Sequence, residues 1–297
     1  MKRVVVTGAT SMIGVALIKA CIEKGVSVLA IVRKNSNRSE RLPKSNLIKI
    51  VYADLEELEF TEFEEETYDV FYHFAWVGTT REIRNNPKLQ QDNIRTTLCA
   101  VEMAHKFGCK KFIGAGSQAE FGPIDGVISE ESSVNPNTAY GIAKYAANML
   151  SRKLCEQYGI VHIWGRIFSV YGCNDNEGTM ISYAVNQIKN DEIAKFSAAT
   201  QMWNYLFEDD AGMMFYLLGK GDVEGGTYCI AHDKSQILKE YICTLNDICG
   251  GVCQFAPDTG EKLMGLCVDT SKLTKAIEYL PQVTFEDGIK RIWETRR

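Results

Sequence analysis

The chain has 297 residues, enough for one large domain or for two unequal lobes around a shared core. Its 33 Lys and Arg against 38 Asp and Glu give a net charge of −5, so the composition offers no broad basic surface for nucleic acid or an anionic membrane. No apolar stretch is long enough to span a membrane, and the N-terminus lacks the pattern of a signal peptide. The ten cysteines are scattered rather than set at metal-ligand spacing. We therefore expect a cytoplasmic protein with reduced cysteines and no metal site.

Strand-like and helix-like patterns alternate through the first half of the chain. Runs of β-branched and apolar residues predict strands over residues 3–6, 26–32, 47–52, 70–74, 111–115 and 161–166. Apolar residues at helical spacing predict helices over residues 13–24, 93–107 and 140–158. This order indicates an α/β fold, a Rossmann-type doubly wound parallel sheet with helices on both faces.

After residue 170 the pattern becomes irregular. We expect a short strand over residues 227–230 and helices over residues 235–248 and 285–295, separated by Gly and Asn. The prediction is therefore a dinucleotide-binding domain over residues 1–170, which also holds the catalytic groups, and a smaller mixed α/β lobe over residues 171–297. The second lobe is expected mainly to bind substrate, and the chain is expected to cross between the two.

The segment TGATSMIG, residues 7–14, lies between the first predicted strand and helix. In a doubly wound sheet this turn presents a helix N-terminus to a pyrophosphate. Gly8 permits the tight turn, and Gly14 allows the helix to pack closely on the strand. Ser11 stands where a middle glycine is usual, and its hydroxyl can donate to a phosphate. Because a lone glycine motif is weak, an ordinary strand-to-helix turn remains the alternative.

The end of the second strand indicates which dinucleotide is bound. An acidic residue there would select NAD, whereas this chain has Arg33, Lys34 and Arg38. A guanidinium group suits the 2′-phosphate of NADP, so NADP(H) is the expected cofactor and NAD the alternative. A solvated basic loop would give the same residues. Asp54, after the third strand, can accept from the adenine amino group or be a plain surface residue.

The segment YGIAK places Tyr140 and Lys144 on one face of a helix. A tyrosine hydroxyl has a reference pKa of about 10, which nearby positive charge lowers. Hydride transfer at a carbonyl requires one proton at the oxygen, and tyrosine is a suitable donor. The same pair occurs by chance in many helices, so its companions matter.

Three further residues lie where such chemistry needs them. Ser117 follows the strand over residues 111–115 and can bond to the same substrate oxygen. Asn93, at the head of the preceding predicted helix, either orders a proton-relay water or caps that helix. His73 ends the fourth strand, where a packed histidine is a commoner interpretation than a proton carrier.

Taken in order, these segments resemble those of the extended short-chain dehydrogenase/reductases, in the NAD-dependent epimerase/dehydratase group. The matching segments run from residue 7 to residue 210: TGATSMIG, AD (53–54), HFAW (73–76), NIRTT (93–97), GSQAEFG (116–122), YGIAK (140–144), RIFSVYG (166–172) and QMWNYLFEDD (201–210). The resemblance implies Ser117, Tyr140 and Lys144 as the catalytic set with Asn93 in support. It also implies a nucleotide-sugar substrate between the lobes, and a homodimer formed through two helices of each subunit.

Two sets of binding residues are expected from their positions in these segments and at the strand ends. Those expected at the cofactor are Thr7, Gly8, Thr10, Ser11, Met12, Ile13, Gly14, Arg33, Lys34, Arg38, Asp54, Leu55, Phe74, Ala75, Trp76, Tyr140, Lys144 and Ile167. Those expected at the substrate are Thr79, Thr80, Ser117, Gln118, Ser169 and Trp203. A solvated loop is the alternative for Thr79, Thr80 and the neighbouring Arg81, and core packing is the alternative for Trp203.

Departures from the family pattern exclude some of the reactions that the family catalyses. The 4,6-dehydratases of this group have a Thr-Asp-Glu run at the catalytic serine, whereas this chain has Ser117, Gln118 and Ala119, so both elimination groups are missing. GDP-fucose synthases have a Cys where Ala119 stands. A 4-ketoreductase or an NAD-dependent 4-epimerase remains. Many relatives also have a diphosphate-binding Arg where this chain has Trp203, so the diphosphate must be bound by other groups or in a different pose.

The basic end of the second strand favours the reductase, because a reductase draws hydride from the NADPH pool. The segments GSQAEFG, TAYGIAK and RIFSVYG look most similar to bacterial reductases that make deoxysugar nucleotides for surface polysaccharide, such as CDP-abequose synthase-like proteins. We therefore expect NADPH-dependent reduction of a 4-keto-6-deoxy nucleotide sugar. A nucleotide-sugar 4-epimerase, a reductase of other carbonyl compounds and a non-catalytic dinucleotide-binding protein are the alternatives.

Overall fold

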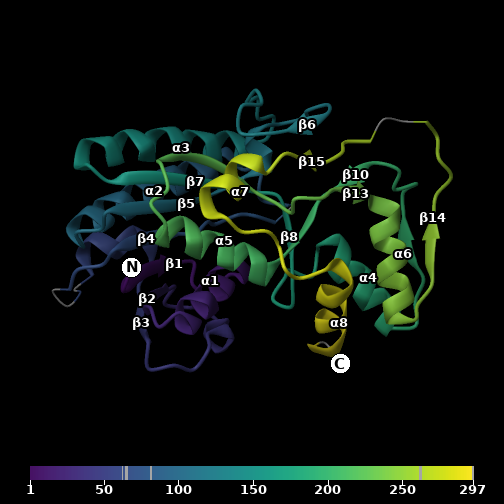
Figure 1. Cartoon of the computed structure of the whole chain (residues 1–297), viewed down its shortest axis with the longest axis horizontal. Coiled ribbons are helices and arrows are strands. Elements are labelled where there is room, and N and C mark those ends of the chain that lie inside the picture. Colours follow the sequence, from purple (N-terminus) through teal and green to yellow (C-terminus); the bar gives the residue numbers. More distant parts are fainter. Residues whose placement is uncertain (62, 64–65, 81, 261–262, 296–297) are drawn as a thin grey trace.

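A seven-stranded parallel sheet lies in the left half of the molecule as drawn in Figure 1. The computed structural model describes residues 1–61, 63, 66–80, 82–260 and 263–295. The sheet has the strand order β12-β7-β5-β4-β1-β2-β3. Its strands are β1 (Arg3–Thr7), β2 (Ser27–Val32), β3 (Ile48–Tyr52), β4 (Val70–His73), β5 (Lys111–Ser117), β7 (Val161–Ile167) and β12 (Gly226–Ile230). The order reverses between β1 and β4, which opens a crevice beyond their carboxyl ends. The predicted doubly wound sheet is thus confirmed.

The valine run of β1 is explained by burial on both faces of the sheet. Val4 and Val6 pack in one hydrophobic cluster with α1 (Met12–Glu23) and α5 (Glu208–Lys220). Val5 points to the other face and packs with α2 (Pro87–Lys106) and α3 (Ala139–Tyr158). A strand covered on both faces needs apolar side chains at every position, so its sequence is continuous rather than alternating.

Helix α2 begins earlier than the sequence pattern indicates. Asn86 is its N-cap, since the Asn86 side chain accepts from the backbone N–H groups of Lys88 and Leu89, and Pro87 follows in the first turn. The first turns of the helix are polar and hide the apolar periodicity. The prediction that Asn93 heads the helix is therefore wrong, because Asn93 lies inside it.

The chain after residue 170 contributes both to the sheet and to a second hydrophobic core. Helix α5 packs against α1, and β12 pairs in parallel with β7, so the predicted strand over residues 227–230 belongs to the main sheet. Helix α5 is buried along most of its length, so its sequence lacks the apolar stripe from which a helix is predicted. The expected helix over residues 235–248 begins instead at Leu238, because residues 236 and 237 form β13 (Gln236–Ile237), paired with β10 (Met202–Trp203).

The second core lies beside the sheet, at the right of Figure 1. It is enclosed by α4 (Met180–Lys189), α6 (Leu238–Cys249) and α8 (Phe285–Thr295). Three short strand pairs lie outside the main sheet: β8 (Ser169–Tyr171) with β11 (Tyr205–Phe207), β6 (Val127–Ile128) with β15 (Cys267–Val268), and, within the second core, β9 (Ala194–Phe196) with β14 (Cys253–Phe255). Helix α7 (Ser271–Ile277) packs against α5 and β12.

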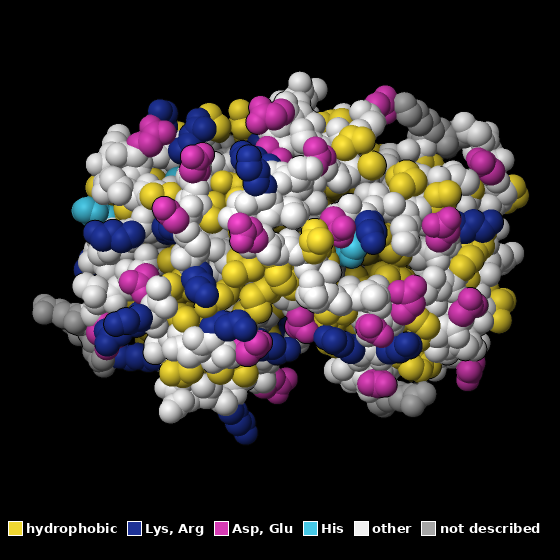
Figure 2. Space-filling model, viewed as in Figure 1, with side chains coloured by type: hydrophobic (Ala, Val, Ile, Leu, Met, Phe, Trp, Pro, Cys, Tyr) yellow, Lys and Arg dark blue, Asp and Glu magenta, His cyan; other side chains and the backbone are white. Residues whose placement is uncertain are grey.

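The surface carries both signs of charge. On the face drawn in Figure 2, the acidic and basic side chains of the described residues are interspersed. Within the described residues no helix has the length and apolar character needed to cross a membrane.

Candidate active site

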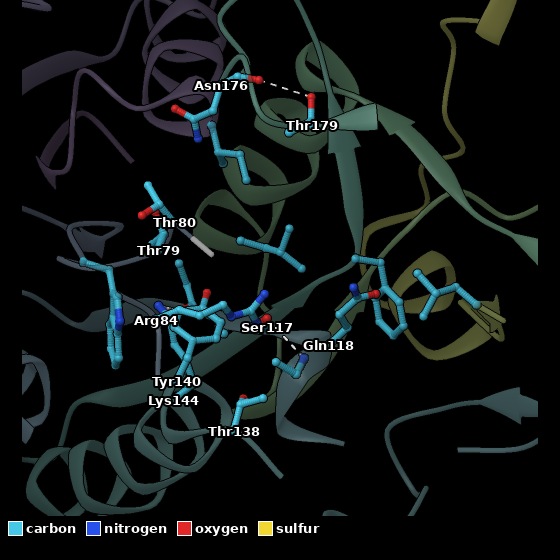
Figure 3. Close-up of a pocket in the computed structure, with 18 of the residues that line it drawn as sticks. Thr79, Thr80, Arg84, Ser117, Gln118, Thr138, Tyr140, Lys144, Asn176 and Thr179 are labelled. Carbon is cyan, nitrogen blue, oxygen red and sulfur yellow. Dashed lines mark hydrogen bonds between the residues drawn. The ribbon is translucent and has the colours of Figure 1, made fainter. Parts of the chain in front are cut away.

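A cavity of about 870 Å³ opens beyond the carboxyl end of β5 (Figure 3). Its walls come from the end of β5, the first turns of α3, the loop after β4, and two loops of the C-terminal half. The polar and charged residues on these walls include Thr79, Thr80, Arg84, Ser117, Gln118, Asn137, Thr138, Tyr140, Lys144, Asn174, Asn176 and Thr179. The structure thus brings Ser117, Tyr140 and Lys144 to one cavity.

Two local features bring Tyr140 beside Ser117. Thr138 caps α3, since its hydroxyl accepts from the backbone N–H of Gly141 at 3.0 Å. A Cβ at Gly141 would lie 2.2 Å from the carbonyl oxygen of Ala119, so only glycine lets the first turn of α3 pack on the chain after β5. The Ser117 hydroxyl in turn accepts from the N–H of Ala119 at 3.2 Å.

Opposing effects set the pKa of Tyr140. Desolvation by burial is the largest and raises the pKa above its ordinary value, and the carboxylate of Glu120 adds to the rise. A side-chain hydrogen bond with Ser117 and the positive charge of Arg84 lower it. The net result is a raised pKa, so the phenol carries its proton at neutral pH.

Lys144 is buried beneath Tyr140. Its ammonium donates to the carbonyl oxygen of Ala115 at 2.7 Å and lies 3.6 Å from the centre of the Trp76 ring and 5.8 Å from that of Tyr140. Burial lowers the pKa of Lys144 to about 7, against the opposing effect of Glu120. The charge of Lys144 is therefore sensitive to what occupies the neighbouring cavities.

Glu120 is a buried residue beside the site, and the sequence analysis did not identify it. Its carboxylate accepts from the Ser117 N–H at 2.9 Å, from Trp164 Nε1 at 2.8 Å and from Arg166 Nε at 2.9 Å. Glu120 and Arg166 are almost fully buried, so they form an internal ion pair. Both residues lie within the family-like segments, but nothing in their spacing indicates that they pair.

Asn93 and His73 are not among the described residues that line this cavity, and Asn93 lines the second cavity described below. The Asn93 amide holds the chain after β4, because it donates to the carbonyl oxygen of Val77 at 2.9 Å and accepts from the Val77 N–H at 2.8 Å. His73 lies between the hydroxyls of Thr7, 2.9 Å from Nδ1, and Thr97, 3.2 Å from Nε2. Burial lowers its pKa to about 3, which describes a neutral, packed histidine.

A second cavity of about 450 Å³ adjoins the first at the glycine turn. The two share Ser11, Arg38, Phe74 and Trp76. Other predicted cofactor residues line the second cavity, namely Gly8, Thr10, Arg33, Asp54, Leu55 and Ala75. Met12, Ile13 and Ile167 line the first.

The glycine turn fits a dinucleotide. Ser11 caps α1, and its hydroxyl accepts from the N–H of Gly14 at 3.1 Å, which places the positive helix end at the cavity. Gly8 has φ +66°, and a Cβ there would lie 2.5 Å from the N of Ala75, so the turn closes tightly against the end of β4. The cavity thus has the two elements that a pyrophosphate and its nucleoside need, a helix N-terminus and a polar rim.

Several predicted residues lie off both cavity walls. The described residues that line the two cavities do not include five of the predicted ones: Thr7, Gly14, Lys34, Ser169 and Trp203. Lys34 is exposed and pairs with Glu57, whereas Thr7 is fully buried. Trp203 packs between the second core and a cluster around Phe121 and Phe168. Arg81 lies outside the described residues.

Comparison with known proteins identifies the family. The model of the NAD dependent epimerase/dehydratase family matches residues 4–231, which is more than half of the chain. The chain belongs to this family. The match includes the glycine turn, the segment with Ser117, and the Tyr140–Lys144 pair.

Individual relatives of this epimerase/dehydratase chain are distant but cover most or all of its length. It is 23% identical to dTDP-4-dehydro-6-deoxyglucose reductase of Escherichia coli, over 99% of this chain and 97% of the relative. It is 22% identical to CDP-abequose synthase of Yersinia pseudotuberculosis, over 83% and 84% of the two chains. Among solved structures, a UDP-glucose 4-epimerase with UDP-glucose from Thermotoga maritima has a TM-score of 0.86 at 21% identity, covering 99% and 98%. That likeness shows the common fold.

Proposed function

We propose that this protein reduces a 4-keto-6-deoxy nucleotide sugar with NADPH, giving a deoxysugar nucleotide for surface polysaccharide. The observation that carries this proposal is the convergence of Ser117, Tyr140 and Lys144 in one cavity that adjoins the cavity of the glycine turn. A substrate carbonyl in the first cavity then meets a proton donor beside the cofactor. The similarity to a dTDP-4-dehydro-6-deoxyglucose reductase supports the same reaction class.

The residues divide the work of carbonyl reduction. When bound, the reduced dinucleotide supplies a hydride to the carbonyl carbon. Tyr140 donates its proton to the carbonyl oxygen, and its raised pKa keeps that proton in place at neutral pH. The Ser117 hydroxyl orients the same oxygen, and Lys144 holds the ribose of the nicotinamide and supplies positive charge. General acid catalysis of this kind contributes roughly 10²–10⁴-fold.

Preference for NADPH is proposed from the rim of the second cavity. Arg33, Ser36 and Arg38 line it at the end of β2, where a 2′-phosphate needs positive charge and hydroxyl donors. Asp54, across the cavity, is suited to the adenine amino group. In the first cavity, Thr79, Thr80 and Gln118 are the proposed sugar-binding residues.

A nucleotide-sugar 4-epimerase that keeps NAD bound is the second candidate. The observation that favours it is the fold shared with solved 4-epimerases, such as a UDP-glucuronic acid 4-epimerase from Bacillus cereus in complex with NAD, with a TM-score of 0.82 at 19% identity. The two reactions use the same proton donor and differ in whether the cofactor is consumed.

The decisive experiment follows the absorbance of reduced nicotinamide. Purified protein is mixed with NADPH or NADH and with enzymatically made 4-keto-6-deoxy sugars of dTDP, CDP, GDP and UDP. We expect NADPH oxidation with one of these sugars and its loss in Tyr140→Phe, while cofactor binding is retained. Turnover without oxidation of added NADPH, together with NAD recovered from denatured protein, would establish the epimerase instead.

A further inference from the structure

Arg84 lies on the loop between β4 and α2, and this loop is attached to the start of α3. The N–H of Arg84 donates to the carbonyl oxygen of Thr80 at 2.9 Å, and the side chain of Asn85 accepts from the N–H of Ala139 at 3.2 Å. Because Ala139 directly precedes Tyr140, the loop and the catalytic tyrosine are held in one local structure. These two hydrogen bonds hold the backbone of Arg84 close to that of Tyr140.

The guanidinium of Arg84 covers one face of Tyr140. Its central carbon lies 4.9 Å from the centre of the Tyr140 ring. Figure 3 shows the Arg84 side chain extending across Tyr140 toward Ser117 on the cavity wall. The Nε atom of Arg84 is buried without a hydrogen-bond partner, and no carboxylate of the described residues forms an ion pair with this arginine. A partly buried cation without a counter-charge is costly unless a ligand provides an acceptor.

We infer that Arg84 is a catalytic residue whose guanidinium donates to the same substrate oxygen as Ser117 and Tyr140. This inference rests on the proposed function, because it assumes a sugar carbonyl in the cavity. With Arg84, the oxygen is met by three donors rather than two. Such donors stabilise the negative charge that develops on the oxygen in the transition state.

The step balances with these groups. A hydride from the reduced nicotinamide forms the new C–H bond, the π electrons of the carbonyl move to oxygen, and that oxygen takes the phenolic proton of Tyr140. The nicotinamide is oxidised and the sugar carbon is reduced. Arg84 stabilises the oxygen while its charge is greatest, and solvent later returns a proton to Tyr140.

Arg84 provides a positive charge near Tyr140 that does not depend on the protonation of Lys144. The charged and titratable groups facing Tyr140 are Lys144 and Glu120 from within the fold and Arg84 from the cavity side. The side chain of Ser117 forms a hydrogen bond with Tyr140. Since burial lowers the pKa of Lys144 to about 7, Lys144 is partly neutral near that pH, whereas an arginine stays protonated.

Two substitutions and a matched control test the inference. Arg84→Met keeps an unbranched apolar side chain and removes the charge and the donors, and Arg84→Lys keeps the charge and an ammonium donor but loses the planar guanidinium. Arg291→Met is the control, because the Arg291 guanidinium also lies over a ring, 5.4 Å from the centre of Phe207, but off both cavities. We expect Arg84→Met to lower kcat by about 100-fold or more with NADPH affinity unchanged, Arg84→Lys to fall between, and Arg291→Met to keep wild-type kcat. A kcat within about threefold of wild type in Arg84→Met would overturn the inference.

A second readout separates this inference from the proposed reaction. The phenol of Tyr140 is titrated by the absorbance difference between proteins with Tyr140 and with Tyr140→Phe, in the wild-type and Arg84→Met backgrounds. Loss of a neighbouring positive charge moves the midpoint to higher pH, and an unchanged midpoint would contradict the role of Arg84. If the wild type reduces no keto sugar, the reductase proposal fails, whereas this titration still shows whether the charge of Arg84 acts on the phenol of Tyr140.

Discussion

Glu120 shows how a single buried side chain supports the proposed catalytic site. It joins the Ser117 backbone to Trp164 and Arg166, and it raises the pKa of both Tyr140 and Lys144 through its charge. A carboxylate buried this completely is stable only while all of its donors remain in place. Glu120 is therefore a positioning residue for Ser117.

Removing one member of the Glu120–Arg166 pair should destabilise the protein more than removing both. We expect Glu120→Ala to lower the free energy of unfolding by about 3–5 kcal/mol, because Arg166 is left charged and buried. Adding Arg166→Met should recover part of the loss. Urea unfolding measures both, with Glu156→Ala, from the exposed pair with Lys153, as a control that should change little. Additive losses in the double variant would contradict this account.

The proposed catalytic residues that line the first cavity could be predicted from the sequence, but their surroundings could not. Tyr140 and Lys144 are four apart in one helix, and Ser117 ends a strand, so local spacing places each of them. Arg84 and Glu120 act through neighbours that are far apart in the sequence, such as Arg166. No local pattern carries that information, because the contacts exist only after the sheet and α3 have packed.

At the scale of elements, the turn between β1 and α1 depends on the backbone of Gly8. Both Gly8 and Gly25 have a left-handed φ, near +66° and +70°, but only Gly8 is crowded, because a Cβ there would lie 2.5 Å from Ala75 and 2.6 Å from Phe74. We expect Gly25→Ala to cost about 1–2 kcal/mol of stability and to leave cofactor binding intact. Gly8→Ala should cost more and weaken NADPH binding, as measured by urea unfolding and nicotinamide fluorescence. Equal effects of the two substitutions would show that crowding at Gly8 is unimportant.

Strands are easier to predict than helices in this chain, for a physical reason. A parallel strand buried on both faces is a short, uninterrupted apolar run, as in β1 and β2. A helix is recognised from the periodicity of its apolar residues. This signal is lost when a helix is mostly polar or is buried on all sides. The first turns of α2 are too polar, and α5 is too uniformly buried, to show an apolar stripe.

At the scale of the whole molecule, the chain leaves the sheet after β7 and returns to it. Helix α5 covers α1, and β12 adds a strand beside β7. The large buried side chain of Phe215, from α5, lies against Phe74 at the wall of the second cavity, with ring centres 4.8 Å apart. The part of the chain before residue 170 therefore depends on residues beyond that position for part of its core.

This dependence predicts how truncated chains will behave. A chain ending at residue 170 exposes the face of α1 that α5 covers and the edge of β7, so we expect it to aggregate or to remain partly unfolded.

Joining residues 1–171 through a flexible Gly-Ser linker to residues 205–231 restores β11, α5 and β12 without the second core. That chain should unfold cooperatively in urea and bind NADPH, yet should not reduce a nucleotide sugar, because the loops at 174–179 and 264–266 are missing from the cavity wall. Cooperative folding of the chain that ends at residue 170 would mean that its sheet is complete without β12. Turnover by the linked chain would place the substrate entirely on the first lobe.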